Sequence, residues 1–231
     1  ETKNQSFEKV HVDGTRAVVE SCRQSDPDMR YVQMSALGVG PDKRAGYRDT
    51  KHRAEQIVKQ SRLRWTIVRP SLVHGPDGEF TQMAVDWVRG AAPPYLFLPY
   101  FSRWKKAGFG FEAPFVAPVF VEDVARVFGG AIGNDAAIGK TYELSGSQRL
   151  RFPEMLRIYA QNLKPGLPWF IAAWQARLAK LVGLGGLLPF DEGMAIMGGR
   201  DSVSENASVI ADFGFTPAEF EASLQTYADQ L

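Results

Sequence analysis

Residues 30–78 constrain the fold of this chain more than any other stretch. They read as an apolar strand at 30–34, a loop, a helix at 47–60, a second apolar strand at 64–68, and a turn with Gly75 and Pro76. The second strand is almost continuously apolar, as expected for a strand covered on both faces. Two such strands joined by a helix predict a parallel βαβ unit, and therefore an α/β fold.

The predicted helix at 47–60 carries a polar pair, Tyr47 and Lys51. These residues are four positions apart, so they share one face of the helix. A phenol beside an ammonium group is a proton-transfer pair, and we expect the charge of Lys51 to lower the pKa of Tyr47. The remaining donors of the lysine can bind a ribose hydroxyl. The same spacing also occurs on many solvated helix faces, so its meaning depends on the neighbouring segments.

Those neighbouring segments follow a recognisable order. A strand that ends in Ser35 precedes the helix, and a strand that runs into Arg69 and Pro70 follows it. This order resembles the extended and atypical short-chain dehydrogenase/reductase families, which are NAD-dependent epimerase/dehydratase-like. The subgroup it resembles most contains the nucleotide-binding accessory subunit of respiratory complex I and its bacterial relatives. The matching phrases are HVDGTRAVVESC at 11–22, MSALG at 34–38, YRDTKHRAE at 47–55, IVRPSLVHGPDGEF at 67–80 and VFVEDVA at 119–125.

The resemblance implies a doubly wound, Rossmann-like parallel sheet with NADP or NAD bound at the carboxyl ends of its strands. It implies that Tyr47 is the general acid or base and that Lys51 holds the ribose next to the nicotinamide. For Arg69, a salt bridge at the end of the strand is an equally good interpretation. The implied cofactor-binding residues are Tyr47, Lys51, Arg69, Pro70, Ser71 and Leu72.

Ser35 is the candidate for the catalytic hydroxyl that polarises the substrate oxygen, but its position is displaced. Members of these families usually carry that hydroxyl one or two residues further on, where this chain has Ala36 and Leu37. Three interpretations therefore stay open. The protein is an oxidoreductase or a sugar-nucleotide epimerase, a nucleotide-binding accessory or redox-sensing subunit without turnover, or an inactive fragment.

The sequence has no glycine-rich phosphate loop. A dinucleotide site needs such a turn before its first helix, yet neither G-x-G-x-x-G nor G-x-x-G-x-x-G occurs. We therefore expect the chain to begin about halfway through the nucleotide-binding domain. Residues 1–78 and 116–146 are expected to form the C-terminal half of that domain. Residues 79–115 and 147–231 are expected to form a smaller, mostly helical substrate lobe.

Apolar periodicity predicts the remaining elements. Helices are expected at 7–22, 78–90, 121–128, 152–163 and 169–181, and strands at 116–120 and 140–145. Residues 216–219, Thr-Pro-Ala-Glu, read as a capping box that opens a final helix. The helix at 169–181 has the character of a peripheral membrane or partner contact, although burial within the lobe is the simpler interpretation.

Composition limits the classes of partner. The 231 residues carry a formal net charge of +1 without a basic stripe, which argues against nucleic acid. The single cysteine, Cys22, excludes an intrachain disulfide and fits a reducing cytosol, so a cytoplasmic location is expected. His11, His52 and His74 are isolated in sequence, so no metal site is expected. A protein partner or a homo-oligomer is compatible with the sequence, and the small-molecule substrate is not specified by it.

Overall fold

The computed structural model describes residues 6–41, 46–92, 102–104, 109, 111–162 and 200–231. The chain divides into two compact units, which are described separately here. The first unit is Glu1–Ser71, Glu122–Ser145 and Ser204–Pro217, and the second is Leu72–Val121, Gly146–Val203 and Ala218–Leu231. The predicted division into a nucleotide-binding part and a substrate lobe concerns function as well as compactness, so it stays a prediction.

The first unit is built on a three-stranded parallel sheet. Its strands are β1 (Arg30–Met34), β2 (Arg64–Pro70) and β8 (Lys140–Leu144), in the order β1-β2-β8. The parallel pairing confirms the predicted Rossmann-like α/β class. The central position of β2 explains why its sequence is almost continuously apolar.

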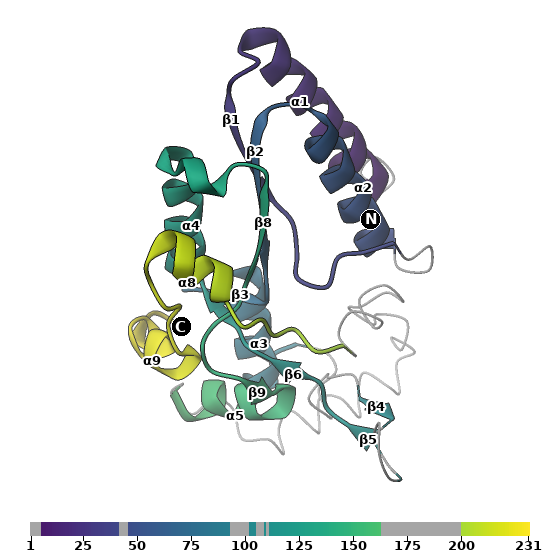
Figure 1. Ribbon diagram of the computed structural model, residues 1–231. Coiled ribbons are helices and arrows are strands. Elements are labelled where there is room, and N and C mark those ends of the chain that lie inside the picture. Colours follow the sequence, from purple (N-terminus) through teal and green to yellow (C-terminus); the bar gives the residue numbers. More distant parts are fainter. Residues whose placement is uncertain (1–5, 42–45, 93–101, 105–108, 110, 163–199) are drawn as a thin grey trace. The chain divides into compact units, whose positions relative to one another are not determined.

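Helices cover both faces of this sheet. They are η1 (Glu8–Asp13), α1 (Gly14–Ser25), α2 (Gly46–Gln60), α4 (Val121–Gly133), η2 (Asp135–Ala137) and α8 (Ala207–Phe213). In Figure 1, α1 and α2 lie on one side of the strands, and α4 and α8 lie on the other. The helix predicted at 7–22 is present, but Glu8–Asp13 form a π-helical turn instead of α-helix.

The apolar face of α2 fixes the helix against the sheet. Val58 of α2 and Val19 of α1 pack with Leu63 and Ile67 in one buried cluster. Full burial of an aliphatic side chain stabilises a fold by about 1.5–3 kcal/mol relative to exposure. This cluster therefore fixes the position of α2 against the sheet. In this way it also positions the polar residues of the helix.

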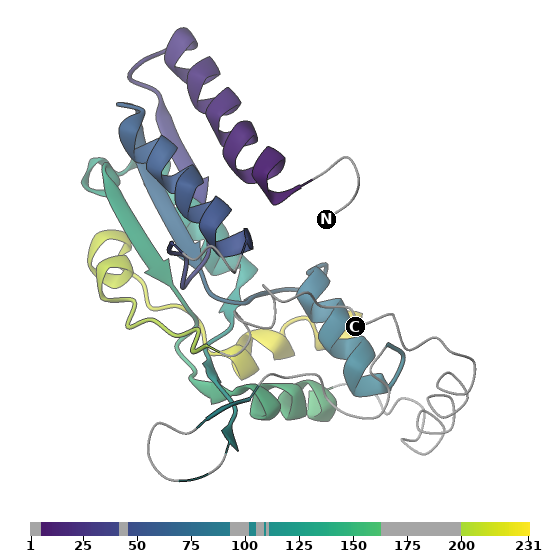
Figure 2. The same cartoon turned by 90° about the vertical axis from the view of Figure 1, so that its right-hand side faces the viewer.

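In its described residues, the second unit combines short strand pairs with helices. β3 (Val73–His74) pairs with β7 (Val119–Phe120), β4 (Arg103–Trp104) with β5 (Phe111–Glu112), and β6 (Phe115–Val116) with β9 (Leu150–Arg151). The helices are α3 (Glu79–Arg89), α5 (Phe152–Asn162) and α9 (Phe220–Gln225), followed by η3 (Ala228–Gln230). Figure 2 shows α3 and α5 near each other, and Met155, Leu156 and Tyr159 of α5 lie in the shared core. None of the helices in the described ranges combines the length and the apolar character needed to cross a bilayer.

Two predicted elements differ in the structure. The strand expected at 116–120 is interrupted at Pro118, which has no N–H to donate, and its two halves pair with different strands. The prediction of a capping box at 216–219 is wrong, because the final helix begins at Phe220 and Glu219 has extended backbone angles. The side chain of Gln148 accepts the N–H of Glu221 at 2.9 Å and so supplies the cap from a distant segment. The helix predicted at 169–181 lies outside the described residues.

Candidate functional site

The predicted site residues of the first unit gather where β1 and β2 end. Ser35 directly follows β1, Arg69 lies near the end of β2, and α2 presents Tyr47 and Lys51. Because β1 and β2 are parallel neighbours, their carboxyl ends meet at one edge of the sheet. In open α/β sheets this edge is the usual place for a ligand.

Tyr47 and Lys51 come together as their spacing predicts. The Nζ atom of Lys51 lies 5.8 Å from the centroid of the Tyr47 ring. The same Nζ donates to the carbonyl oxygen of Met34 at 3.5 Å, which is a long and weak hydrogen bond, so the described residues leave the donors of Lys51 largely uncommitted.

The protonation of this pair differs from the prediction. Burial raises the pKa of Tyr47 above its ordinary value, so the expected lowering by Lys51 is wrong. Burial also lowers the pKa of Lys51, and the charge of Glu55 opposes that change. Removal of both groups from water therefore favours their neutral forms and outweighs their mutual attraction.

An aromatic cluster that the sequence did not reveal surrounds Tyr47. The Tyr47 ring meets the Phe7 and His11 rings edge-on, with centroids 5.6 Å and 5.2 Å away. Phe7 and His11 stack on each other at 5.5 Å. Both residues precede the first strand by about twenty positions, so no local pattern links them to α2.

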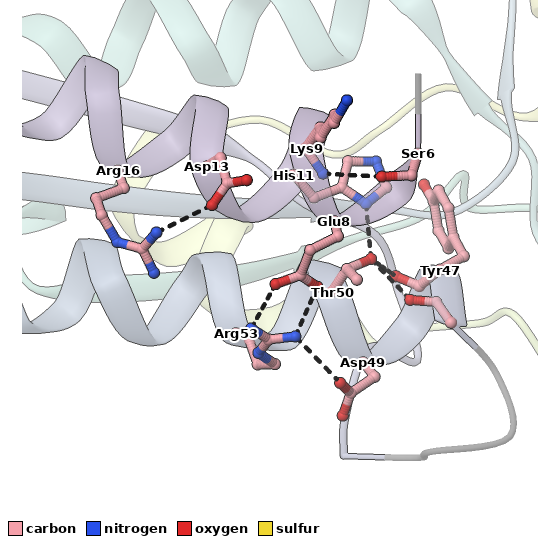
Figure 3. A network of polar contacts seen from close by, with 11 residues as sticks. Ser6, Glu8, Lys9, His11, Asp13, Arg16, Tyr47, Asp49, Thr50 and Arg53 are labelled. Carbon is pink, nitrogen blue, oxygen red and sulfur yellow. Dashed lines mark hydrogen bonds and ion pairs between the residues drawn. The ribbon is translucent and has the colours of Figure 1, made fainter. Parts of the chain in front are cut away.

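His11 is also bound to α2 through a hydrogen bond. Its Nδ1 lies 2.9 Å from Oγ1 of Thr50, which in turn donates to the carbonyl oxygen of Gly46 at 2.7 Å. Figure 3 shows this chain of contacts beside Tyr47. Burial, together with the charge of Lys51, lowers the pKa of His11 to about 4. The imidazole is therefore neutral near pH 7.

A second polar cluster holds Ser35 and Arg69. The Ser35 hydroxyl donates to Glu55 Oε1 at 2.6 Å. The Arg69 guanidinium binds both oxygens of the same carboxylate, at 2.8 Å and 2.7 Å, and also approaches Glu143 at 3.5 Å. Glu55 has 0% exposed surface. Burial raises the pKa of Glu55, but hydrogen bonds from Arg69 and Ser35 outweigh it and hold that pKa below its usual value.

The sequence left two interpretations for Arg69, a cofactor contact and a salt bridge at the end of the strand. The structure shows the salt bridge, with Glu55 as the partner. Glu55 was missed by sequence reasoning, although it lies four residues after Lys51 and so extends the face of Tyr47 and Lys51. The sequence signal that could have revealed Glu55 was a carboxylate four residues after Lys51 on the same helix.

The other predicted cofactor residues tie strand ends together. The Pro70 carbonyl oxygen accepts from the N–H of Leu37 at 2.8 Å, and the N–H of Ser71 donates to Leu144 at 2.8 Å. Leu72 belongs to the second unit, where it packs against the core. Contact of these residues with a cofactor stays a prediction.

The arrangement suits one end of a dinucleotide. Lys51 offers largely uncommitted donors suited to ribose hydroxyls, and Tyr47 offers a protonated phenol beside it. The chain lacks the glycine-rich turn that would receive the pyrophosphate. The residues present therefore fit the nicotinamide nucleoside, and they leave the phosphates without a loop from this chain.

Comparisons with known proteins agree with the motifs. A family model described as NAD(P)H-binding matches residues 2–86. Subunit 9 of the NADH dehydrogenase [ubiquinone] 1 alpha subcomplex, mitochondrial, from Rattus norvegicus is 27% identical over 83% of this chain and 47% of its own length. The Arabidopsis thaliana protein of the same name is 29% identical over 68% of this chain and 37% of its own. The chain thus spans about half the length, or less, of these curated relatives.

Solved structures show the same fold at lower identity. UDP-glucose 4-epimerase from Thermus thermophilus, in complex with NAD, superimposes with a TM-score of 0.62 at 18% identity, covering 96% of this chain and 70% of that one. A dTDP-glucose 4,6-dehydratase from Bacillus anthracis, in complex with NAD, gives 0.62 at 16% identity, covering 100% and 70%. The matches support the relationship that the motifs indicated. The chain is related to the complex I subunits named above, and it shares the Rossmann-like fold of the NAD-dependent epimerases and dehydratases.

Proposed function

We propose that this chain forms the nicotinamide side of an NAD(P) site in a protein that binds the dinucleotide without rapid turnover. Such a protein serves as a nucleotide-binding accessory or redox-sensing subunit. The observation that carries this proposal is the hydrogen bond from Ser35 to Glu55, because it occupies the one hydroxyl proton at the end of β1.

A reductase or epimerase site of this kind needs a hydroxyl that donates to the substrate oxygen. The Ser35 hydroxyl has one proton, and that proton lies on the 2.6 Å bond to Glu55. Turning the hydroxyl away would remove a donor from a buried carboxylate, which costs about 1–3 kcal/mol or more for a charged group. Ala36 and Leu37, at the usual catalytic positions, have no hydroxyl. These features favour binding over turnover.

The proposed binding chemistry uses the face of α2. Lys51 holds the ribose hydroxyls, and the Tyr47 phenol lies beside them as a neutral donor. When bound, NAD or NADP supplies the capacity to accept or give a hydride. Ser35, with its proton fixed on Glu55, offers the cofactor an acceptor instead of a donor.

A second candidate function is catalysis of an oxidoreductase or sugar-nucleotide epimerase type. The observation that favours it is the proximity of Lys51 to the Tyr47 ring, which is the arrangement a Tyr-Lys proton-transfer pair requires. Under this candidate Ser35 would reorient in the substrate complex. The relatives named as NADH dehydrogenase subunits favour the first candidate and a protein partner. Their names say mitochondrial, so the cytoplasmic location stays a prediction for this chain.

The experiment uses protein expressed from its own locus. Its intact mass, its nucleotide content after extraction and its dissociation constant for NADPH and NADH are measured. We expect bound nucleotide, and we expect Lys51→Met to weaken binding by about tenfold, which equals the loss of about 1.4 kcal/mol. Lys59→Met is the matched control, because Lys59 lies on the same helix and also approaches Glu55.

Two outcomes would overturn the proposal. If the mass equals that of this chain and neither nucleotide binds at millimolar concentration, the inactive fragment is the correct interpretation. If the protein consumes NAD(P)H or epimerises a sugar nucleotide, and Tyr47→Phe abolishes that activity, the second candidate replaces the first.

A further inference from the structure

His11 occupies an unusual place in the backbone. It lies in the π-helical turn η1, where the chain packs against the start of α2. Single π-helical turns are rare, and they occur frequently at functional sites. The motifs around Tyr47 assign no role to this histidine.

The hydrogen bonds of Thr50 favour one tautomer of His11. The Thr50 hydroxyl has one proton and lies 2.7 Å from the Gly46 carbonyl oxygen and 3.2 Å from the Tyr47 carbonyl oxygen, and neither carbonyl can donate. With that proton on a carbonyl, Thr50 accepts from His11, so the 2.9 Å contact favours a proton on Nδ1. The neutral imidazole then has a bare lone pair on Nε2. Among the described residues, Nε2 has no hydrogen-bond partner.

Several charged groups near His11 pair with one another. On η1, Glu8 binds Arg53 of α2 through both carboxylate oxygens, at 2.6 Å and 2.7 Å. Arg53 also approaches Asp49 at 4.0 Å, and Asp13 pairs with Arg16 at 3.0 Å. Figure 3 shows that the Glu8–Arg53 pair joins η1 to α2, whereas the other two pairs lie within α2 and along η1 and α1. Lys51 is the charge that acts on the imidazole, and it disfavours a second proton there.

His11 is unsuited to accept the Tyr47 proton outright. The imidazolium is much the stronger acid, because burial lowers the pKa of His11 to about 4 and raises the pKa of Tyr47 above its ordinary value. What the geometry provides is a fixed ring against the Tyr47 edge, with an acceptor nitrogen that stays open.

We propose that His11 is a positioning residue for Tyr47: the Nδ1–H bond to Thr50 fixes the imidazole, which holds the phenol ring in place. The effect on nucleotide binding rests on the proposed function. The tautomer and the packing of Tyr47 do not depend on it.

The first test reads the tautomer directly, in nucleotide-free protein at pH 7. Long-range ¹H–¹⁵N correlation spectra distinguish Nδ1–H from Nε2–H imidazoles, and His11→Phe assigns the signals. We expect the Nδ1–H form for His11, and a shift towards the Nε2–H form in Thr50→Val, which keeps the side-chain size but removes the acceptor. An Nε2–H signal in the unmodified protein, or no change in Thr50→Val, would overturn the proposal.

The second test follows Tyr47 by ¹³C-tyrosine NMR, with Tyr47→Phe for assignment. We expect Thr50→Val to move the Tyr47 pKa down, towards its ordinary value, because a loosened imidazole exposes the phenol to water. His52→Gln, on the same helix, is the control and is expected to leave Tyr47 unchanged. A Tyr47 pKa that is the same in Thr50→Val as in the unmodified protein would contradict a positioning role.

Nucleotide affinity separates this inference from the proposed function. We expect about a threefold to tenfold weaker NADPH binding in Thr50→Val and none of this loss in His52→Gln. If the unmodified protein binds no nucleotide, the proposed function fails, and the two NMR tests alone decide the role of His11. If it binds and Thr50→Val binds equally well, the role of His11 at the nucleotide site is refuted.

Discussion

Two histidine–tyrosine pairs show how differently the same residue types are used in the two units. In the second unit, His74 has 1% exposed surface, and its Nδ1 accepts the Tyr227 hydroxyl at 2.7 Å. Its Nε2 lies 3.4 Å from Oγ of Ser223, whose own proton goes to the Glu219 carbonyl oxygen at 2.7 Å. These contacts favour the Nε2–H tautomer for His74, the opposite of the tautomer favoured for His11.

The difference lies in what each pair leaves available. In the His74 pair both ring nitrogens and the Tyr227 hydroxyl have partners inside the unit, as buried polar groups require. In the His11 pair, the described residues leave both Nε2 and the Tyr47 hydroxyl without a hydrogen-bond partner, and an ammonium group lies nearby. A satisfied pair stabilises a core, whereas an unsatisfied pair beside a charge is a candidate for binding a ligand.

The largest loss of stability is expected in the cluster around Glu55 in the first unit, where the buried carboxylate has hydrogen-bond partners. Arg69→Met removes both charge-assisted bonds and leaves a carboxylate buried without its main partner. Breaking a buried ion pair in this way costs about 3–5 kcal/mol. Urea unfolding measures the loss. Adding Glu55→Leu should restore much of the stability, and a double variant as unstable as Arg69→Met alone would contradict this account.

Acid titration tests the burial of His74 in the second unit. Burial lowers the pKa of His74 to about 4 from an ordinary value of 6.5. Because the folded pKa is the lower one, the unfolded chain binds more protons in this window, and stability is lost as the pH falls from about 6.5 to 4. The loss for His74 is on the order of 3 kcal/mol. Unfolding free energies across this range should lose that slope in His74→Gln, and an unchanged slope would argue against a buried neutral imidazole.

Removal of each tyrosine hydroxyl compares the pairs most closely. Tyr227→Phe leaves the Nδ1 of buried His74 without a donor, which costs about 1–3 kcal/mol. Tyr47→Phe removes a hydroxyl that has no partner among the described residues, so a change within about 0.5 kcal/mol is expected. Equal losses in the two variants would show that Tyr47 is a structural residue after all.

Sequence patterns predicted the local elements well. The apolar runs at Arg30–Met34 and Arg64–Pro70, and the helix between them, follow from periodicity that any buried strand or amphipathic helix must show. The proximity of Tyr47 and Lys51 follows from helical spacing alone.

Long-range effects escaped prediction, for physical reasons. The contact of His11 with Thr50 joins residues 39 positions apart, and no local pattern encodes it. The direction of the Tyr47 pKa depends on how much water its neighbours exclude, which spacing cannot reveal. The capping box failed because the side chain of Gln148, 73 positions away, caps the last helix.

The most direct test of binding without turnover follows a labelled hydride. Protein from its own locus is loaded with NADPH deuterated at the transferable position of the nicotinamide, then incubated with a cellular metabolite extract. Mass spectrometry reads the label on the bound nucleotide over hours. The account predicts nucleotide that stays bound and keeps its deuterium, equally in the unmodified protein and in Tyr47→Phe. Loss of the label in the unmodified protein but not in Tyr47→Phe would show catalysis and contradict it.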